Sequence, residues 1–105
     1  MDNGTYEYAL EMTTPLGIRH GNLELRVQAG FLNGSLTMFT RTIPIRAGRW
    51  EENRIFFCGD MKTLMKMLPY QAEGQISGNQ ISLTFLTETG DYPATGCLVK
   101  HSKEV

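Results

Sequence analysis

The chain has 105 residues, of which 41% are hydrophobic and 20% charged, and its formal net charge is −1. This length and composition favour one globular domain over residues 1–105 and exclude an intrinsically disordered chain. The ten basic and eleven acidic side chains nearly cancel. We therefore expect no nucleic-acid partner, because affinity for nucleic acids comes largely from neutralising phosphates.

Alternation of apolar and polar residues is the dominant pattern along the chain. Apolar side chains recur at every second position in residues 6–12, 23–29 and 81–85. This period is typical of strands that bury one face and expose the other, as in antiparallel sheets. The predicted strands, in chain order, are residues 4–13, 20–29, 32–40, 42–47, 53–60, 68–77, 79–88 and 91–100.

Turn residues separate these strands. Thr14-Pro15-Leu16-Gly17 combines Pro and Gly in the order of a tight reversal, and Ser77-Gly78-Asn79 lies between two alternating runs. Both segments predict hairpins. Two further turns are predicted at Ala47-Gly48-Arg49 and at Thr89-Gly90-Asp91.

Residues 60–68 have two interpretations. Apolar residues at positions 61, 64, 65 and 68, with Asp60 available as an N-cap, indicate a short helix. A faint internal repeat indicates a hairpin tip instead, since the segments that begin at Thr14, Thr63 and Thr87 each follow a strand and are each followed by a glycine within a dozen residues. We favour the hairpin.

Eight sequential strands with short connections predict an all-β protein, an antiparallel up-and-down barrel. Closure into a barrel removes the unpaired sheet edges that otherwise promote aggregation. The interior of an eight-stranded barrel is either filled by side chains or holds one small ligand. A two-sheet β-sandwich is the alternative architecture.

Three short segments carry a resemblance to a known group of proteins. Gly-Asn-Leu-Glu-Leu at 21–25, Asn-Gly-Ser-Leu at 33–36 and Gly-Gln-Ile-Ser-Gly-Asn-Gln-Ile at 74–81, within the run of eight strands, resemble small uncharacterised bacterial proteins of the calycin-like type. These are barrels like those of lipocalins and fatty-acid-binding proteins. Gly4-Thr5-Tyr6 stands where lipocalins have Gly-x-Trp, so the resemblance permits a bound lipid without implying one.

The chain carries no pattern for export, membrane insertion or metal binding. Its first residues lack a basic segment followed by an apolar one, and no run approaches the 18 apolar residues of a membrane-spanning helix, so we expect a cytoplasmic protein without a membrane partner. Its two cysteines, Cys58 and Cys97, are expected to be reduced thiols. The Cys and His spacing matches no metal motif, and we expect no metal and no other cofactor.

Catalytic residues are not evident either. His20 and His101 are the only histidines, and a nucleophile activated by histidine needs that base within hydrogen-bond reach. His20 lies in a predicted turn and His101 near the end of the sequence given. We interpret both as surface residues, predict no catalytic residue and favour a protein that is not an enzyme.

The strongest functional pattern is a basic segment, residues 41–66, with a local charge of +3 against −4 for the rest of the chain. Arginine suits bidentate recognition of carboxylate or phosphate, and tryptophan offers a stacking face. The predicted ligand-binding residues are the four arginines of this segment, its tryptophan and four tyrosines at inward positions: Arg41, Arg46, Arg49, Arg54, Trp50, Tyr6, Tyr8, Tyr70 and Tyr92. In the alternative interpretation these arginines pair with nearby carboxylates on a solvated loop.

Two functions remain open from the sequence. The first is a barrel that binds a small apolar or anionic ligand inside or at its mouth, near residues 41–54. The second is a non-catalytic, self-associating structural or accessory-subunit module. It rests on the Met-rich residues 61–68 and on residues 55–58, which are apolar on both faces of a strand and need a cover outside the barrel. Residues 61–68 or the partner subunit of a homodimer are the candidate covers.

Overall fold

The computed structural model describes residues 2–63 and 65–103, and within them it contains strands and turns but no helix. The nine strands are β1 (Gly4–Thr14), β2 (Gly17–Gln28), β3 (Phe31–Met38), β4 (Arg41–Pro44), β5 (Arg46–Glu51), β6 (Arg54–Lys62), β7 (Met67–Ser77), β8 (Gln80–Thr87) and β9 (Gly90–Lys103). The alternating sequence pattern is responsible, because it leaves each strand one apolar face to bury.

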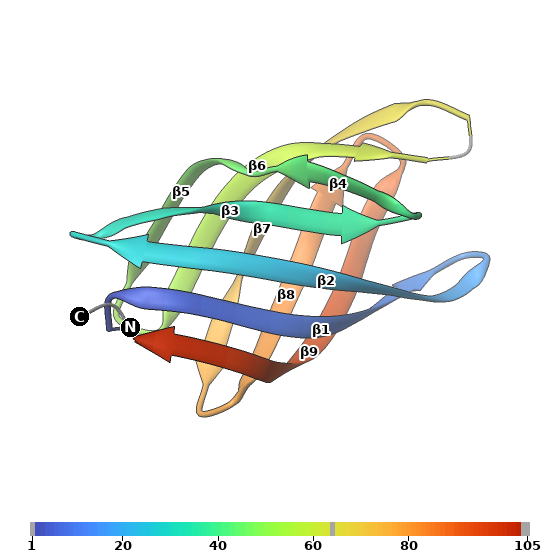
Figure 1. Ribbon diagram of the computed structural model, residues 1–105. Helices are drawn as coiled ribbons and strands as arrows, with labels where there is room; N and C mark the ends of the chain where they lie inside the picture. Colours follow the sequence, from blue (N-terminus) through green and yellow to red (C-terminus); the bar gives the residue numbers. More distant parts are fainter. Residues whose placement is uncertain (1, 64, 104–105) are drawn as a thin grey trace.

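The strands form one antiparallel sheet that closes into a barrel (Figure 1). The order is β2-β1-β9-β8-β7-β6-β5-β3-β4, and an additional β2–β3 pairing closes the circle. β4 is the one strand beyond an eight-stranded up-and-down barrel, because β4 and β5 both pair with the same side of β3. The predicted barrel is confirmed, and closure of a single sheet rules out the sandwich.

The predicted turn at Ala47-Gly48-Arg49 is wrong. These residues belong to β5, whose register with β6 shifts between Arg46 and Arg49. Ala47 has a φ of 52°, so the backbone bulges here and then resumes its pairing. The chain reverses later, after Glu51, at a residue with a φ of 56°, Glu52. A glycine beside a left-handed residue is typical of both bulges and turns, and the sequence does not distinguish them.

The hairpin interpretation of residues 60–68 is confirmed, and the short helix is wrong. Met61 pairs directly with Leu68 across β6 and β7, and both side chains are buried. The apolar spacing therefore comes from two inward positions on facing strands rather than from one helix face. Leu64, the second residue of that spacing, lies outside the described residues.

Apolar side chains fill the middle of the barrel, and among the described residues every buried side chain there is hydrophobic. An aromatic cluster lies in this region. The ring of Phe85 meets those of Tyr70 and Phe57 edge-on, with centroids 5.1 and 6.3 Å apart. Such perpendicular contacts are the favoured geometry of buried aromatic pairs. Of the two interiors that eight strands allow, this barrel has the filled one at its centre.

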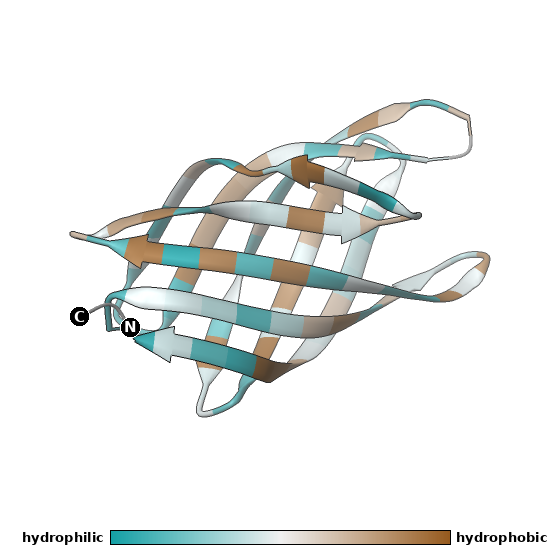
Figure 2. Ribbon diagram, in the orientation of Figure 1, coloured by the Kyte–Doolittle hydropathy of each residue, from teal (hydrophilic) through white to brown (hydrophobic). Residues whose placement is uncertain are grey.

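The up-and-down order gives the barrel two different ends. We call the end formed by the β1–β2, β3–β4, β6–β7 and β8–β9 hairpins the mouth, and the opposite end, where β1 begins and β9 ends, the closed end (Figure 1). The β1–β2 and β6–β7 hairpins project from the mouth, and Figure 2 shows hydrophobic segments along both. This distribution is opposite to the usual preference for polar residues at turns.

Candidate functional site: the apolar mouth of the barrel

A pocket with a volume of about 510 Å³ lies between the hairpins of the mouth. Met12, Met61 and Leu68 line it from inside the barrel and are 1%, 2% and 6% exposed. Phe39 and Tyr92, which are partly buried against the core, line it nearer the rim. The pocket thus lies at the mouth end of the core. Inward-facing side chains still line it there, but none from the opposite strands fill the space between them.

Three of the hairpins around this pocket share one turn structure, built on Thr14, Thr63 and Thr87. In each, the threonine Oγ1 donates to the carbonyl oxygen three residues later, at 2.7, 2.9 and 2.7 Å. It also accepts from the amide two residues later, at 3.2, 3.3 and 3.2 Å. The internal repeat seen in the sequence therefore marks equivalent turns, all at the same end of the barrel.

The remaining hairpin, β3–β4, is held in a locally unfavourable backbone conformation. Phe39 and Thr40 have φ values of 54° and 64°. Two-residue hairpin loops with positive φ at both positions favour Asn-Gly, whereas an aromatic and a β-branched residue are strained there. Both residues line the pocket. Strain retained at a pocket wall is a reason to regard this wall as functional.

The rim of the pocket is cationic. Arg19 and Lys66 are its two charged lining residues. Lys66 Nζ lies 2.9 Å from the carboxylate of Glu88 on the neighbouring β8–β9 turn. Within residues 2–63 and 65–103, no carboxylate lies within ion-pair distance of Arg19. An apolar pocket with a cation on its rim suits a molecule with an apolar body and an anionic group.

The structure separates the predicted ligand-binding tyrosines. Tyr92 lines the mouth pocket, and its hydroxyl lies 2.7 Å from the Thr89 hydroxyl. Tyr70 lies deeper, in the aromatic cluster, where burial raises the pKa of its phenol although nearby Arg46 opposes the shift. Tyr6 and Tyr8 line a recess at the closed end. Only Tyr92 therefore contributes to the candidate site.

Three of the predicted arginines, on β5 and β6, lie along the outer wall, and the fourth, at the start of β4, lies at the mouth. Arg46 pairs with Asp60 at 2.8 Å, as the alternative interpretation predicted for the arginines. The guanidinium carbons of Arg49 and Arg54 lie 4.9 and 5.5 Å from the centroid of the Phe56 ring. Such contacts are cation–π interactions. Arg41, at the start of β4, is exposed and pairs with Met38.

Trp50 follows Arg49 on β5, and its side chain faces the core rather than the outer wall. It is partly buried against the core, and its Nε1 is buried without a hydrogen-bond partner among the described residues. Its cross-strand partner is Ile55, at the closed end of β5 and β6. The indole is therefore not available as a stacking face beside the arginines.

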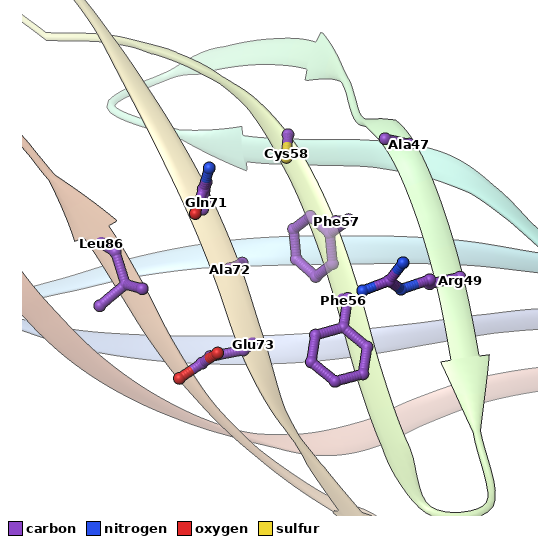
Figure 3. A pocket seen from close by; sticks show the side chains of 9 residues that line it. All are labelled: Ala47, Arg49, Phe56, Phe57, Cys58, Gln71, Ala72, Glu73 and Leu86. Atoms are coloured by element: carbon purple, nitrogen blue, oxygen red, sulfur yellow. The ribbon is translucent and has the colours of Figure 1, made fainter.

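A second, smaller pocket of about 250 Å³ lies on the outer wall (Figure 3). Arg49 and Glu73 flank the Phe56 ring there. The apolar outer face of β6, for which the sequence predicted a cover, is thus partly covered within the chain by the guanidinium groups of Arg49 and Arg54, which lie over Phe56. Its small volume and opposed charges make it a weaker ligand site than the mouth.

The histidines and cysteines lie outside the mouth pocket. Both histidines are exposed, as predicted. His20 belongs to β2 rather than to a turn, 3.9 Å from the Glu11 carboxylate, and His101 stacks on Tyr6 at 4.2 Å. Cys58 and Cys97 are free thiols, as predicted. In the described part of the chain, no three His, Cys, Asp or Glu side chains are placed to hold a metal ion.

Comparison with known protein families, with curated proteins and with solved structures finds no match to this chain. Over residues 2–63 and 65–103 there is no helix of the length and apolar character needed to cross a bilayer. The geometry of the mouth is therefore the basis for inferring a function.

Sequence reasoning missed most of this site. Five residues that line the pocket were not among the predicted binding residues: Met12, Leu16, Arg19, Phe39 and Met65. The sequence did contain one signal of the site. The repeat of Thr14, Thr63 and Thr87 identifies three turns that the barrel places together.

Proposed function

We propose that the mouth of the barrel binds a small amphipathic molecule with one apolar chain or ring and one anionic group. The observation that carries this proposal is the apolar pocket of about 510 Å³, a volume within the range of small-molecule sites. The apolar part would lie on Met12, Met61 and Leu68, and the anionic group would face Arg19 at the rim.

We further propose that the chain is a calycin-like binding protein of the cytoplasm rather than an enzyme. The eight-stranded barrel and its apolar mouth support the comparison with that type. The two free cysteines suit a reducing compartment. Binding of the proposed ligand requires no catalytic role for any residue of the mouth.

The test is isothermal titration with decanoate and with decanol, which share an apolar chain and differ in charge. We expect decanoate to bind more tightly than decanol. Substitution of Arg19 by Gln should weaken decanoate binding about threefold and leave decanol unchanged, because an exposed ion pair contributes about 0.2–1 kcal/mol. The matched control is Arg26→Gln, an exposed position on β2 away from the pocket. Absence of binding by both probes would overturn the proposal.

A self-associating module is the second candidate function. Leu16 and Met65, at the tips of two mouth hairpins, are 83% and 90% exposed, and a second copy meeting this end would bury them. Light scattering of the purified protein over a range of concentrations tests this. A monomer at every concentration would exclude it, whereas a dimer that Leu16→Thr dissociates would support it.

A further inference from the structure

We propose that the two projecting hairpins of the mouth insert their tips into the surface of an anionic lipid bilayer. The β1–β2 tip presents Leu16 and the β6–β7 tip presents Met65, which are 83% and 90% exposed. Ile18 and Met67 stand behind them and are 58% and 46% exposed. Exposed apolar residues gathered at one end of a protein mark an interaction surface.

The turn structure fixes the backbone that carries these two side chains. Leu16 and Met65 occupy the same position, two residues after the turn threonine, and their amides donate to Thr14 Oγ1 and Thr63 Oγ1 at 3.2 and 3.3 Å. The backbone of each tip is thereby fixed while its side chain is free to enter another phase. The equivalent position of the β8–β9 turn holds Thr89, so among these three turns only the β1–β2 and β6–β7 turns carry an apolar residue there.

Charge at the mouth selects the partner. The four turn regions, residues 14–20, 38–42, 61–67 and 87–91, hold four cationic side chains and two carboxylates, a local charge of +2 in a chain of net charge −1. Nearby Asp60 is neutralised by Arg46 at 2.8 Å. Two copies meeting mouth to mouth would bring like charges together. An anionic lipid surface instead attracts cations and accepts apolar side chains at the depth of its headgroups.

This surface contact differs from the membrane-spanning segment whose absence led the sequence analysis to expect no membrane partner. It also goes beyond the proposed ligand binding. Insertion of the tips requires only Leu16, Met65 and the surrounding cations, so it stands even if decanoate does not bind. The two proposals therefore fail separately, one in titration and the other with vesicles.

The experiment is sedimentation of the full chain with vesicles of phosphatidylcholine, alone or mixed in equal parts with phosphatidylglycerol. We expect binding to the mixed vesicles that weakens as salt is added, because the cations act through screened attraction. The variants Leu16→Thr and Met65→Thr introduce the residue found at the equivalent position of the β8–β9 turn, Thr89. The hydrogen bonds between the turn threonine and the backbone of each turn are retained. Each variant should lower partitioning about fivefold, since each removes about 1 kcal/mol of apolar transfer.

Two further variants keep the test specific. Phe31→Thr removes a side chain that is 70% exposed at the closed end, and it should leave vesicle binding unchanged. Thr89→Leu gives the third tip an apolar residue and should raise partitioning about fivefold. Circular dichroism confirms that each variant is folded.

Three outcomes would overturn the proposal. The wild-type chain could fail to sediment with the mixed vesicles, the Leu16→Thr/Met65→Thr variant could bind them as well as wild type, or Phe31→Thr could reduce binding as much as the tip variants. A wild-type dimer that the double tip variant dissociates, without vesicle binding, would assign the same tips to self-association instead.

Discussion

The two ends of the barrel close their hairpins in different ways. At the closed end, turn residues bond to the next strand, Asn53 accepting from the amide of Ile76 at 2.8 Å and Asn79 from that of Leu98 at 2.7 Å. At the mouth, the bonds of Thr14, Thr63 and Thr87 remain within their own turns. Turns at the closed end therefore bond to a neighbouring strand, whereas the threonine bonds described at the mouth order each turn individually.

Two turns, one at each end, differ in how well their residues suit the backbone. Gly78 and Asn79 form the β7–β8 turn, where Gly has the left-handed backbone that it adopts without strain. At the mouth, Phe39 and Thr40 occupy left-handed positions that suit neither residue. Local preference and observed structure thus agree at the β7–β8 turn and conflict at the β3–β4 turn. Such conflicts are expected where function rather than stability has selected the residue.

Tyrosine ionisation should produce the largest difference between the two ends. The Tyr6 hydroxyl at the closed end donates to the carbonyl of Asp2 at 2.7 Å, and burial raises its pKa less than that of Tyr70. Tyr70, on the mouth side of β7, is 4% exposed, and burial raises its pKa above the ordinary value of 10.0. Below pH 10 its phenol is neutral in both states, so stability is complete there. Above pH 10 the phenol ionises in the unfolded chain but stays neutral in the folded protein, so the free energy of unfolding falls as the pH rises.

This loss should approach ~1.4 kcal/mol for each pH unit above about 10, up to the pKa of the folded state. Urea unfolding at about pH 9 and pH 11 measures it. The Tyr70→Phe variant should lose less stability between these two pH values than wild type, by about 1 kcal/mol or more. Equal losses in the two proteins would show that the phenol of Tyr70 does not remain neutral in the folded barrel.

Relief of backbone strain at the mouth should have the next largest effect. It should raise the stability of the protein and lower its affinity for decanoate. Phe39→Asn together with Thr40→Gly places the preferred residues at the two left-handed positions of the β3–β4 turn. We expect the free energy of unfolding to rise by about 1–2 kcal/mol. Decanoate binding should weaken, because the Phe39 ring leaves the pocket wall.

The matched control lies in the corresponding turn of the closed end. Ala29, in the β2–β3 turn, has a φ of 51°, and Ala29→Asn should also raise stability slightly while leaving decanoate binding unchanged. Urea unfolding and titration calorimetry measure both quantities for each variant. If the Phe39→Asn/Thr40→Gly protein gains stability and binds decanoate as before, the strained turn has no part in the site.

The strands could be predicted from the sequence because a period of two is a local signal. Turn positions were less certain, since Ala47 and Gly48 satisfy a bulge as well as a turn. The candidate site was largely beyond reach, because Met12, Phe39 and Met65 come from three separate hairpins that meet only after the barrel closes. The structure does not bring Arg49 and Trp50 onto one face, because adjacent residues of a strand point to opposite faces.

The smallest expected effect comes from Trp50, the only tryptophan of the chain. It is partly buried near the closed end, across the strands from Ile55, whereas the proposed ligand lies among the hairpins of the mouth. Saturation with decanoate should therefore leave the wavelength of its fluorescence maximum unchanged, because that wavelength reports the immediate surroundings of the indole. A shift that follows the binding curve would place the ligand inside the barrel rather than at its mouth, or would show that the two ends are coupled through the core. Because the Phe39→Asn/Thr40→Gly variant alters only the mouth, a shift that persists in this variant at full saturation would favour the interior site.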